Sequence, residues 1–186
     1  MANDLKTFKF TNKADYATST TGWFVNDGIV VDALGGNDRI TGGGSLFNGI
    51  INDGTINTGD GNDKITGTSS GYGILNNETI NTGDGNDIVD ALEGGFGGNG
   101  TTYLDDGNDT LKGFGTGNFY GGAGTDKLIF GEGTYVISGS TVVFDGVIMN
   151  VNQFEQIGGA NGGLFTFGDG TLTVSSTGVG TLDPLG

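Results

Sequence analysis

The sequence has no cysteine and no histidine among its 186 residues. Without them it can form no disulfide, no Cys/His zinc site and no catalytic triad of the Ser-His-Asp or Cys-His type. An imidazole general base is excluded in the same way. We therefore expect a protein that is not an enzyme.

Basic residues are also scarce, with 7 Lys and Arg against 22 Asp and Glu and a formal net charge of −15. Nucleic acids and anionic membrane surfaces are themselves polyanions, so this balance argues against either as a partner. Cations are the expected partners.

Long apolar runs are missing as well, and nowhere do 18 apolar residues follow one another. We therefore expect no membrane span. The first residues, Met1-Ala-Asn-Asp-Leu-Lys6, lack the apolar segment of a signal peptide, so no cleaved export signal is expected.

There is one proline, whereas glycine is abundant, with 41 residues. Such a composition without a period is typical of disordered chains. Here a period is present, and it indicates a solenoid whose coils turn at glycines.

The period is carried by five related stretches. The best copies are Thr58-Gly-Asp-Gly-Asn-Asp-Lys-Ile-Thr66 and Thr82-Gly-Asp-Gly-Asn-Asp-Ile-Val-Asp90, and weaker copies span Ala33–Thr41, Leu104–Lys112 and Gly121–Ile129. All five share an Asp, a Gly two residues before it and an aliphatic residue two after it. The last copy fits Gly-Gly-x-Gly-x-Asp-x-aliphatic-x at every fixed position, which is a signature of calcium-binding β-solenoids.

On these motifs the chain resembles the repeats-in-toxin (RTX, haemolysin-type) calcium-binding family over roughly residues 23–158. The segment Val151-Asn-Gln-Phe-Glu-Gln-Ile157 is similar to one that often follows such repeats. The resemblance implies Ca²⁺ as the bound ion and an extracellular protein, exported by type I secretion through an uncleaved C-terminal signal.

The motif aspartates lie at 38, 63, 87, 109 and 126, with separations of 25, 24, 22 and 17. A regular RTX β-roll has 18 residues per coil and two calcium turns, whereas most coils here are longer and have one. We therefore predict an all-β, parallel and three-sided β-solenoid of about five coils, with calcium-binding turns on one edge and a C-terminal β cap. The expected divisions are an N-terminal cap at 1–22, the solenoid at 23–130, and a C-terminal cap and tail at 131–186.

Alignment on the aspartates predicts two interior columns and two amide ladders. The first column is Ile40, Ile65, Val89, Leu111 and Leu128, the second is Val31, Ile56, Ile80, Thr102 and Phe119, and the ladders place Asn52 over Asn76 and Asn57 over Asn81. The Gly-rich stretch 92–100 is expected to be a loop that breaks the coil register. Residues 165–174 are expected to form a hairpin.

Calcium takes six to eight oxygen ligands from carboxylates and carbonyls. Glycines that adopt positive φ allow carbonyls to point into such a turn. Each ion would lie between two stacked turns, so five turns enclose at most four complete sites. The predicted ligand residues are Asp38, Asp63, Asp87, Asp109 and Asp126, with the turn glycines Gly36, Gly59, Gly61, Gly83, Gly85, Gly107, Gly122 and Gly124. Asp60, Asp84 and Asp106 are expected to point outward.

The alternative is that these are Asn/Asp-Gly turns that only reverse the chain. That would not explain one carboxylate at the same point of every coil. Two such charges ~5 Å apart repel by roughly 3 kcal/mol at an effective dielectric of 20.

The sequence thus predicts a secreted calcium-binding solenoid with a structural, adhesive or surface-interaction role, which folds on calcium binding after export. One alternative is a glycan-binding or ice-binding face, suggested by Thr55-Ile-Asn57 and its copy Thr79-Ile-Asn81. Another is a β-helix of the polysaccharide lyase or epimerase type, for which few basic groups are present. An extracellular glycan or a cell surface is the further partner considered.

Overall fold

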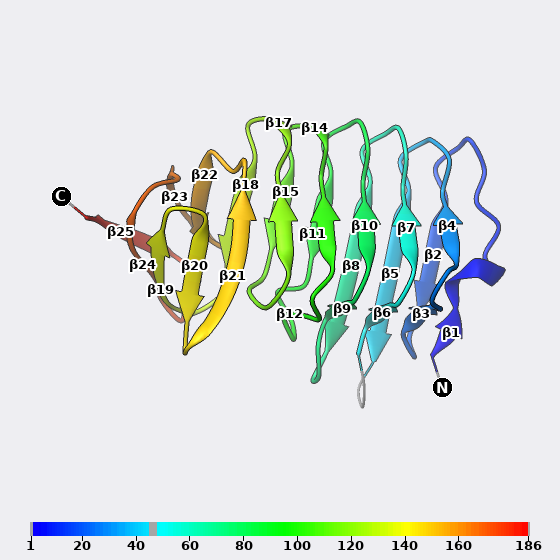
Figure 1. Cartoon of the computed structure of the whole chain (residues 1–186), viewed down its shortest axis with the longest axis horizontal. Coiled ribbons are helices and arrows are strands. Elements are labelled where there is room, and N and C mark those ends of the chain that lie inside the picture. The colour runs from blue at the N-terminus through cyan, green and yellow to red at the C-terminus, as the bar shows by residue number, and fades with distance from the viewer. Residues whose placement is uncertain (1, 45–47, 186) are drawn as a thin grey trace.

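The computed structural model describes residues 2–44 and 48–185 and shows a parallel β-solenoid that ends in an antiparallel cap (Figure 1). Within these residues the only helix is a single 3₁₀ turn, η1 (Leu5–Thr7). No described helix is long and apolar enough to cross a membrane. The chain runs along the solenoid axis from one end to the other, and the two termini lie at opposite ends (Figure 1).

Three sheets form the walls of the solenoid, and we name them A, B and C. Sheet A has the order β1 (Asn3–Asp4), β3 (Trp23–Val25), β6 (Ile50–Asn52), β9 (Ile74–Asn76) and β12 (Phe96–Gly97). Sheet B has the order β2 (Tyr16–Ser19), β5 (Arg39–Gly44), β8 (Lys64–Ser69), β11 (Ile88–Asp90), β15 (Thr110–Lys112), β18 (Lys127–Phe130), β22 (Gln156–Gly159) and β23 (Gly162–Thr166).

Sheet C is the largest and continues from the solenoid into the cap. From the N-terminal end its strands are β4 (Val30–Asp32), β7 (Thr55–Asn57), β10 (Thr79–Asn81), β13 (Thr101–Tyr103), β16 (Asn118–Tyr120), β21 (Val147–Asn152), β20 (Thr141–Phe144), β19 (Gly133–Ser138), β24 (Gly170–Val174) and β25 (Gly180–Pro184). The short strands β14 (Asp106–Gly107) and β17 (Ala123–Gly124) pair with each other at one corner.

The three-sided parallel solenoid predicted from the coil length is confirmed. Four coils have a strand in each sheet, in the order A, C, B, and they begin at β3, β6, β9 and β12. The next coil has β16 in sheet C and β18 in sheet B but none in sheet A. This loss of one side accounts for the shorter final repeat.

The predicted interior columns are also confirmed. Val89 lies in register between Ile65 and Leu111, and Ile80 lies between Ile56 and Thr102. Every residue of both columns is at most 3% exposed. Successive side chains of a strand point to opposite faces, so the three-residue strands of sheets B and C place their middle residue inside and the flanking two outside. In sheet A the pattern is reversed, and β3, β6 and β9 bury their first and third residues.

One rung of the interior is polar. Asn52 and Asn76 are buried in register, and the Asn52 side-chain amide donates to Asn76 Oδ1 at 2.8 Å. The same amide group also donates to the backbone carbonyl of Thr79 at 2.9 Å. The predicted ladder of Asn52 and Asn76 is confirmed, and because both amides are paired their burial carries little penalty. Asn57 and Asn81, predicted to form the other ladder, lie in register.

The prediction that 92–100 is a loop outside the coil register was wrong. Gly94 and Gly95 have positive φ and turn the chain, and β12 then pairs with β9, placing Phe96 opposite Ile74. Phe96 is 2% exposed and packs edge-on against Phe119. The glycines return the chain to sheet A.

The predicted hairpin at 165–174 was also wrong. Its two strands belong to different sheets, since β23 pairs with β22 in sheet B whereas β24 pairs with β19 and β25 in sheet C. The turn between them moves the chain from one wall to another. At the opposite end, β1 and β2 add strands to sheets A and B, and Leu5 of η1 is fully buried.

Candidate metal site: the aspartate column

The five motif aspartates stand at one corner of the solenoid, where the chain leaves sheet C and enters sheet B. Each is the residue directly before a sheet B strand, so that β5, β8, β11, β15 and β18 all begin beside one. These turns form the edge at which β14 and β17 lie in Figure 1. We call Asp38, Asp63, Asp87, Asp109 and Asp126 the aspartate column.

Hydrogen bonds run along the column from coil to coil. The backbone N–H of Asp38 donates to Asp63 Oδ1 at 2.7 Å, that of Asp63 donates to Asp87 Oδ1 at 2.7 Å, and the pattern continues through Asp109. The last of these bonds joins the Asp109 N–H to Asp126 Oδ1 at 2.8 Å. One oxygen of every carboxylate in the column therefore holds the preceding coil in place.

The column has a distinct residue at each end. The backbone N–H of Asp15 donates to Asp38 Oδ1 at 2.7 Å and so begins the series. The Asp126 N–H donates to Glu155 Oε2 at 2.8 Å and ends it. Neither Asp15 nor Glu155 lies in a motif, so the sequence pattern gave no signal for them. Glu155 does lie inside the segment that is similar to the one following RTX repeats.

The second oxygen of each carboxylate has no partner. Oδ2 of all five aspartates is buried and accepts no hydrogen bond from any described residue. The five residues are 0–2% exposed. Burying a carboxylate oxygen without a hydrogen-bond donor costs free energy, and five such oxygens in one column strongly favour binding of a proton or a cation.

The pKa values of all five carboxyl groups are raised, which favours the protonated form. Burial raises the pKa of Asp38 to about 6 and the pKa values of Asp87 and Asp109 to about 7. Burial also raises the pKa of Asp63 and of Asp126. The backbone donor on Oδ1 lowers the pKa, as do the hydroxyls of Thr58 at Asp63 and of Thr82 at Asp87, but burial is the larger effect. For Asp87, repulsion from the carboxylates on both sides adds to the rise.

Glycines allow the turns to stack this closely. All eight turn glycines predicted from the sequence have positive φ, between 85° and 159°. A Cβ at Gly85 would lie 1.6 Å from the carbonyl oxygen of Gly61 in the preceding coil, and one at Gly124 would lie 1.6 Å from that of Gly107. Only a residue without a side chain fits at these positions, because the backbone carbonyl of the neighbouring turn occupies the space.

The position four residues before each aspartate keeps a left-handed backbone even where it is not glycine. Leu34 has φ 74° and Asp105 has φ 64°, alongside Gly59 at 94° and Gly83 at 85°. L-residues adopt this region at a cost of roughly 1–2 kcal/mol. The stacking of the turns therefore determines the backbone conformation at this position, whichever residue occupies it.

A further series of hydrogen bonds, made by asparagines, runs beside the column and was not predicted. Asn62 donates its backbone N–H to Asn37 Oδ1 at 2.9 Å, Asn86 donates to Asn62 Oδ1 at 2.8 Å, and Asn108 donates to Asn86 Oδ1 at 2.9 Å. These bonds run opposite in direction to those of the aspartates. The signal was present in the sequence, since an Asn directly precedes the Asp in four of the five copies.

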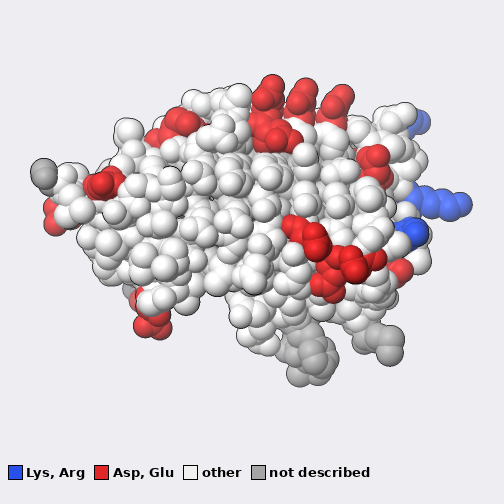
Figure 2. Space-filling model, in the orientation of Figure 1, with Lys and Arg blue, Asp and Glu red and all other residues white. Residues whose placement is uncertain are grey.

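The outward aspartates lie where they were expected. Asp60, Asp84 and Asp106 are exposed. Figure 2 shows acidic side chains in a row along this edge of the solenoid. Because their carboxylates are hydrated, they contribute mainly a long-range field that salt screens.

The donor set suits a cation held between coils. No three acidic side chains converge on one point within the described residues. A cation at the column would therefore take carboxylate oxygens from neighbouring turns and complete its shell with backbone carbonyls or water, as Ca²⁺ does. Comparison with known proteins found no matching family model, no matching curated protein and no matching solved structure.

Proposed function

We propose that the chain is a calcium-binding β-solenoid whose ions lie along the aspartate column. The proposal is carried by one observation, the five buried Oδ2 atoms that have no hydrogen-bond donor. A cation would satisfy them and would also remove the repulsion between neighbouring carboxylates.

Calcium is favoured over other ions by the type of donor. The column offers only carboxylate and carbonyl oxygens, and the chain has no His or Cys that would select zinc or copper. Mg²⁺ demands a small and nearly ideal octahedral site and keeps much of its water, whereas Ca²⁺ accepts irregular oxygen shells. Stacked glycine turns, which bring backbone carbonyls of neighbouring coils close together, suit a shell of the second kind.

The role that follows is structural or one of surface interaction, outside the cell. A ligand that binds only the folded chain stabilises it by about 2.7 kcal/mol per site at a hundredfold excess over Kd. With several sites the solenoid would be stable in a calcium-rich extracellular medium and weakly folded in a calcium-poor cytosol. Adhesion or surface coating suits a rigid rod with long flat walls.

The test is calcium titration by calorimetry, together with circular dichroism in calcium and in EGTA. We expect up to four ions per chain, one for each gap between five stacked turns, and a loss of β signal in EGTA. Asp84→Asn, which alters an exposed carboxylate, serves as the control and should bind the same number.

Two results would contradict the proposal. One is a circular dichroism spectrum and a melting temperature that are the same in calcium and in EGTA. The other is a loss of calcium in Asp84→Asn equal to that in column variants. That second result would mean diffuse attraction of ions to an acidic surface.

A further inference from the structure

Basic side chains are concentrated on one wall of this acidic molecule. Every Lys and Arg beyond residue 13 lies on a strand of sheet B, namely Arg39, Lys64, Lys112 and Lys127. Each alternates with a fully buried neighbour, Ile40, Ile65, Leu111 or Leu128, so all four side chains are on the outer face. The turns therefore carry exposed acidic side chains, whereas this face carries the basic ones.

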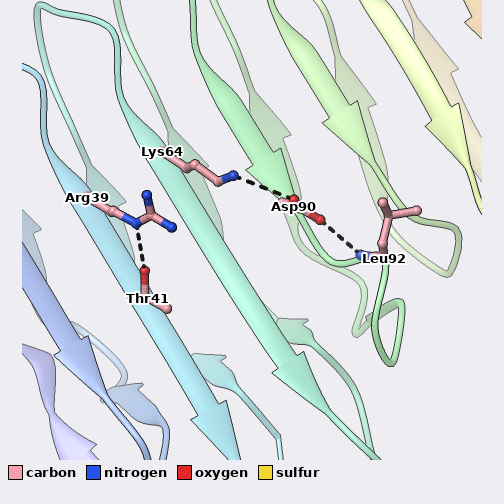
Figure 3. Close-up of polar contacts among 5 residues, drawn as sticks. All are labelled: Arg39, Thr41, Lys64, Asp90 and Leu92. Atoms are coloured by element: carbon pink, nitrogen blue, oxygen red, sulfur yellow. Dashed lines mark hydrogen bonds and ion pairs between the residues drawn. The ribbon is translucent and has the colours of Figure 1, made fainter. Parts of the chain in front are cut away.

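Arg39 differs from Lys64, its neighbour in the next coil. The Lys64 ammonium pairs with the Asp90 carboxylate at 3.8 Å, which offsets its charge. Arg39 Nε donates to Thr41 Oγ1 at 3.3 Å, and across the described part of the chain its guanidinium forms no ion pair. Among the residues drawn in Figure 3, the one contact of the guanidinium is that of Nε with Thr41. The planar fork is therefore oriented by Thr41 and left free to bind an anion.

A hollow begins beside Thr41. It has a volume of about 430 Å³, and its walls carry the hydroxyls of Thr18, Thr20, Thr41 and Thr68, which lie on or directly after the neighbouring strands β2, β5 and β8. The depression exists because Gly43, which has no side chain, lies in register with Thr68 and directly follows Gly42, the register partner of Ser19. We call it the hydroxyl trough.

Two further residues define the surroundings of the trough. Tyr16 is the register partner of Arg39 in the neighbouring strand β2, and its side chain is 68% exposed on the same outer face. Glu93, from the third coil, lines the trough and is exposed. The trough, with its hydroxyls and the Glu93 carboxylate, therefore lies on the same wall of the solenoid as the Arg39 cation and the Tyr16 ring.

We propose that the hydroxyl trough and Arg39 bind a short saccharide that carries one carboxylate, such as a uronic acid unit. The guanidinium fork matches a carboxylate in two parallel hydrogen bonds. The threonine hydroxyls can both donate to and accept from sugar hydroxyls, and Glu93 can accept from them. Tyr16 offers an apolar ring edge or face beside the sugar.

The charge of the ligand follows from the charges around the trough. Arg39 is an unpaired cation beside the trough, whereas Glu93 lines it, so one carboxylate fits beside Arg39 and a second charge would face Glu93. The net charge of −15 also repels densely charged polyanions. The inference does not rest on calcium binding, which is measured separately on the same variants.

The experiment is an NMR titration of the calcium-loaded protein with cellobiouronic acid, a disaccharide with one glucuronate, and with its methyl ester. We expect the acid to bind at least tenfold more tightly than the ester. Arg39→Gln should abolish this preference. Gly43→Thr should weaken both ligands at least tenfold because it fills the trough, and it should fold, since a Cβ there meets no atom closer than Thr68 Oγ1 at 3.4 Å.

Lys127→Gln is the matched control, because Lys127 lies on the outer face of the same sheet but three strands beyond β8. Its titration should equal that of the unaltered chain. Failure of the acid to bind, equal binding of acid and ester, or an unchanged preference in Arg39→Gln would overturn the proposal. Circular dichroism of each variant establishes that it is folded.

Discussion

At the scale of single residues, the two oxygens of each column carboxylate have different tasks. Oδ1 accepts the backbone N–H of the preceding coil, while Oδ2 is buried and unpaired. The first task needs only an acceptor, and a neutral amide could perform it. Oδ2 has no donor in the protein, so we assign it to binding a cation or a proton, which requires the negative charge. Substitutions can therefore separate structure from metal binding.

Asp87→Asn and Asp87→Ala make that separation. Asparagine retains an oxygen for the Asp63 N–H, which Asp87 Oδ1 accepts at 2.7 Å, but lacks the charge. In EGTA at neutral pH we expect Asp87→Asn to melt at or above the temperature of the unaltered chain, because a buried charge is removed. In calcium it should lose the gain from both neighbouring gaps, roughly 2.7 kcal/mol each at a hundredfold excess over Kd.

Alanine should behave differently in the absence of calcium. It leaves the Asp63 N–H buried without an acceptor, which costs about 1–3 kcal/mol. Urea denaturation of both variants, with and without calcium, measures the two effects. Equal destabilisation of the Asn and Ala variants in EGTA would show that the charge, rather than the acceptor, holds the coils together.

The residues of the column could be read from the sequence, since Asp, Gly and aliphatic positions recur at fixed offsets. The partner of each Oδ1 could not, because a backbone N–H carries no side-chain signature. Glu155 was missed because it lies outside the repeat and reaches the column from 29 residues beyond Asp126. A role for Arg39 could not be predicted, since its relation to the hydroxyl trough depends on the side-by-side placement of β2, β5 and β8.

At the scale of elements, the stacked turns are the tightest part of the structure. Gly85→Ala should be severely destabilising, because its Cβ would lie 1.6 Å from the Gly61 carbonyl oxygen and would push two coils apart. Gly28→Ala is the matched control, since Gly28 also has positive φ, 70°, but a Cβ there meets nothing within 4 Å. The control should cost only about 1–2 kcal/mol, the strain of a left-handed alanine.

Thermal melting in calcium compares these two alanine variants. If Gly85→Ala melts as high as Gly28→Ala, the turns are looser than the structure indicates. Calcium titration of Gly85→Ala adds a second measurement. It should show weaker binding than Gly28→Ala, since the coils that would share an ion no longer meet.

The strands themselves were predictable where they repeat and not where they change partner. Short runs with one inward aliphatic residue determined the four regular coils. The strand at Phe96 was not predicted because it has only two residues and glycines surround it. The strands β23 and β24 read as a hairpin because local turn residues lie between them, whereas their pairing is decided by which sheet edge is free. That information is held by the whole fold.

At the scale of the whole molecule, stability should depend on pH in opposite ways with and without calcium. The folded-state pKa values of Asp38, Asp87 and Asp109 are raised from 3.8 to about 6 or 7. A raised pKa means that the folded chain binds more protons than the unfolded one. The stability this provides is complete below pH ~4 and is lost as pH rises through about 6 to 7.

In EGTA, the free energy of unfolding should therefore fall between pH ~4.5 and pH ~7.5. Calcium binds the ionised carboxylates, so calcium should release protons and should bind more tightly as pH rises through the same range. Urea melts across this range, and calorimetry in two buffers of different ionisation enthalpy, test both statements. A calcium-free stability that instead increases toward neutral pH would show that the column is not protonated in the folded chain.

The direction of the aspartate hydrogen bonds has a consequence for the order of assembly. Each coil donates its aspartate N–H to the following coil, from Asp15 at the start to Glu155 at the end. A partial solenoid that grows from its N-terminal end therefore always ends in an unpaired donor, and the next coil to arrive supplies the acceptor. Each added coil accepts the N–H of the previous coil and adds an unpaired aspartate N–H of its own. The series ends when Glu155 accepts the N–H of Asp126. Assembly would thus resemble a zipper with a built-in stop.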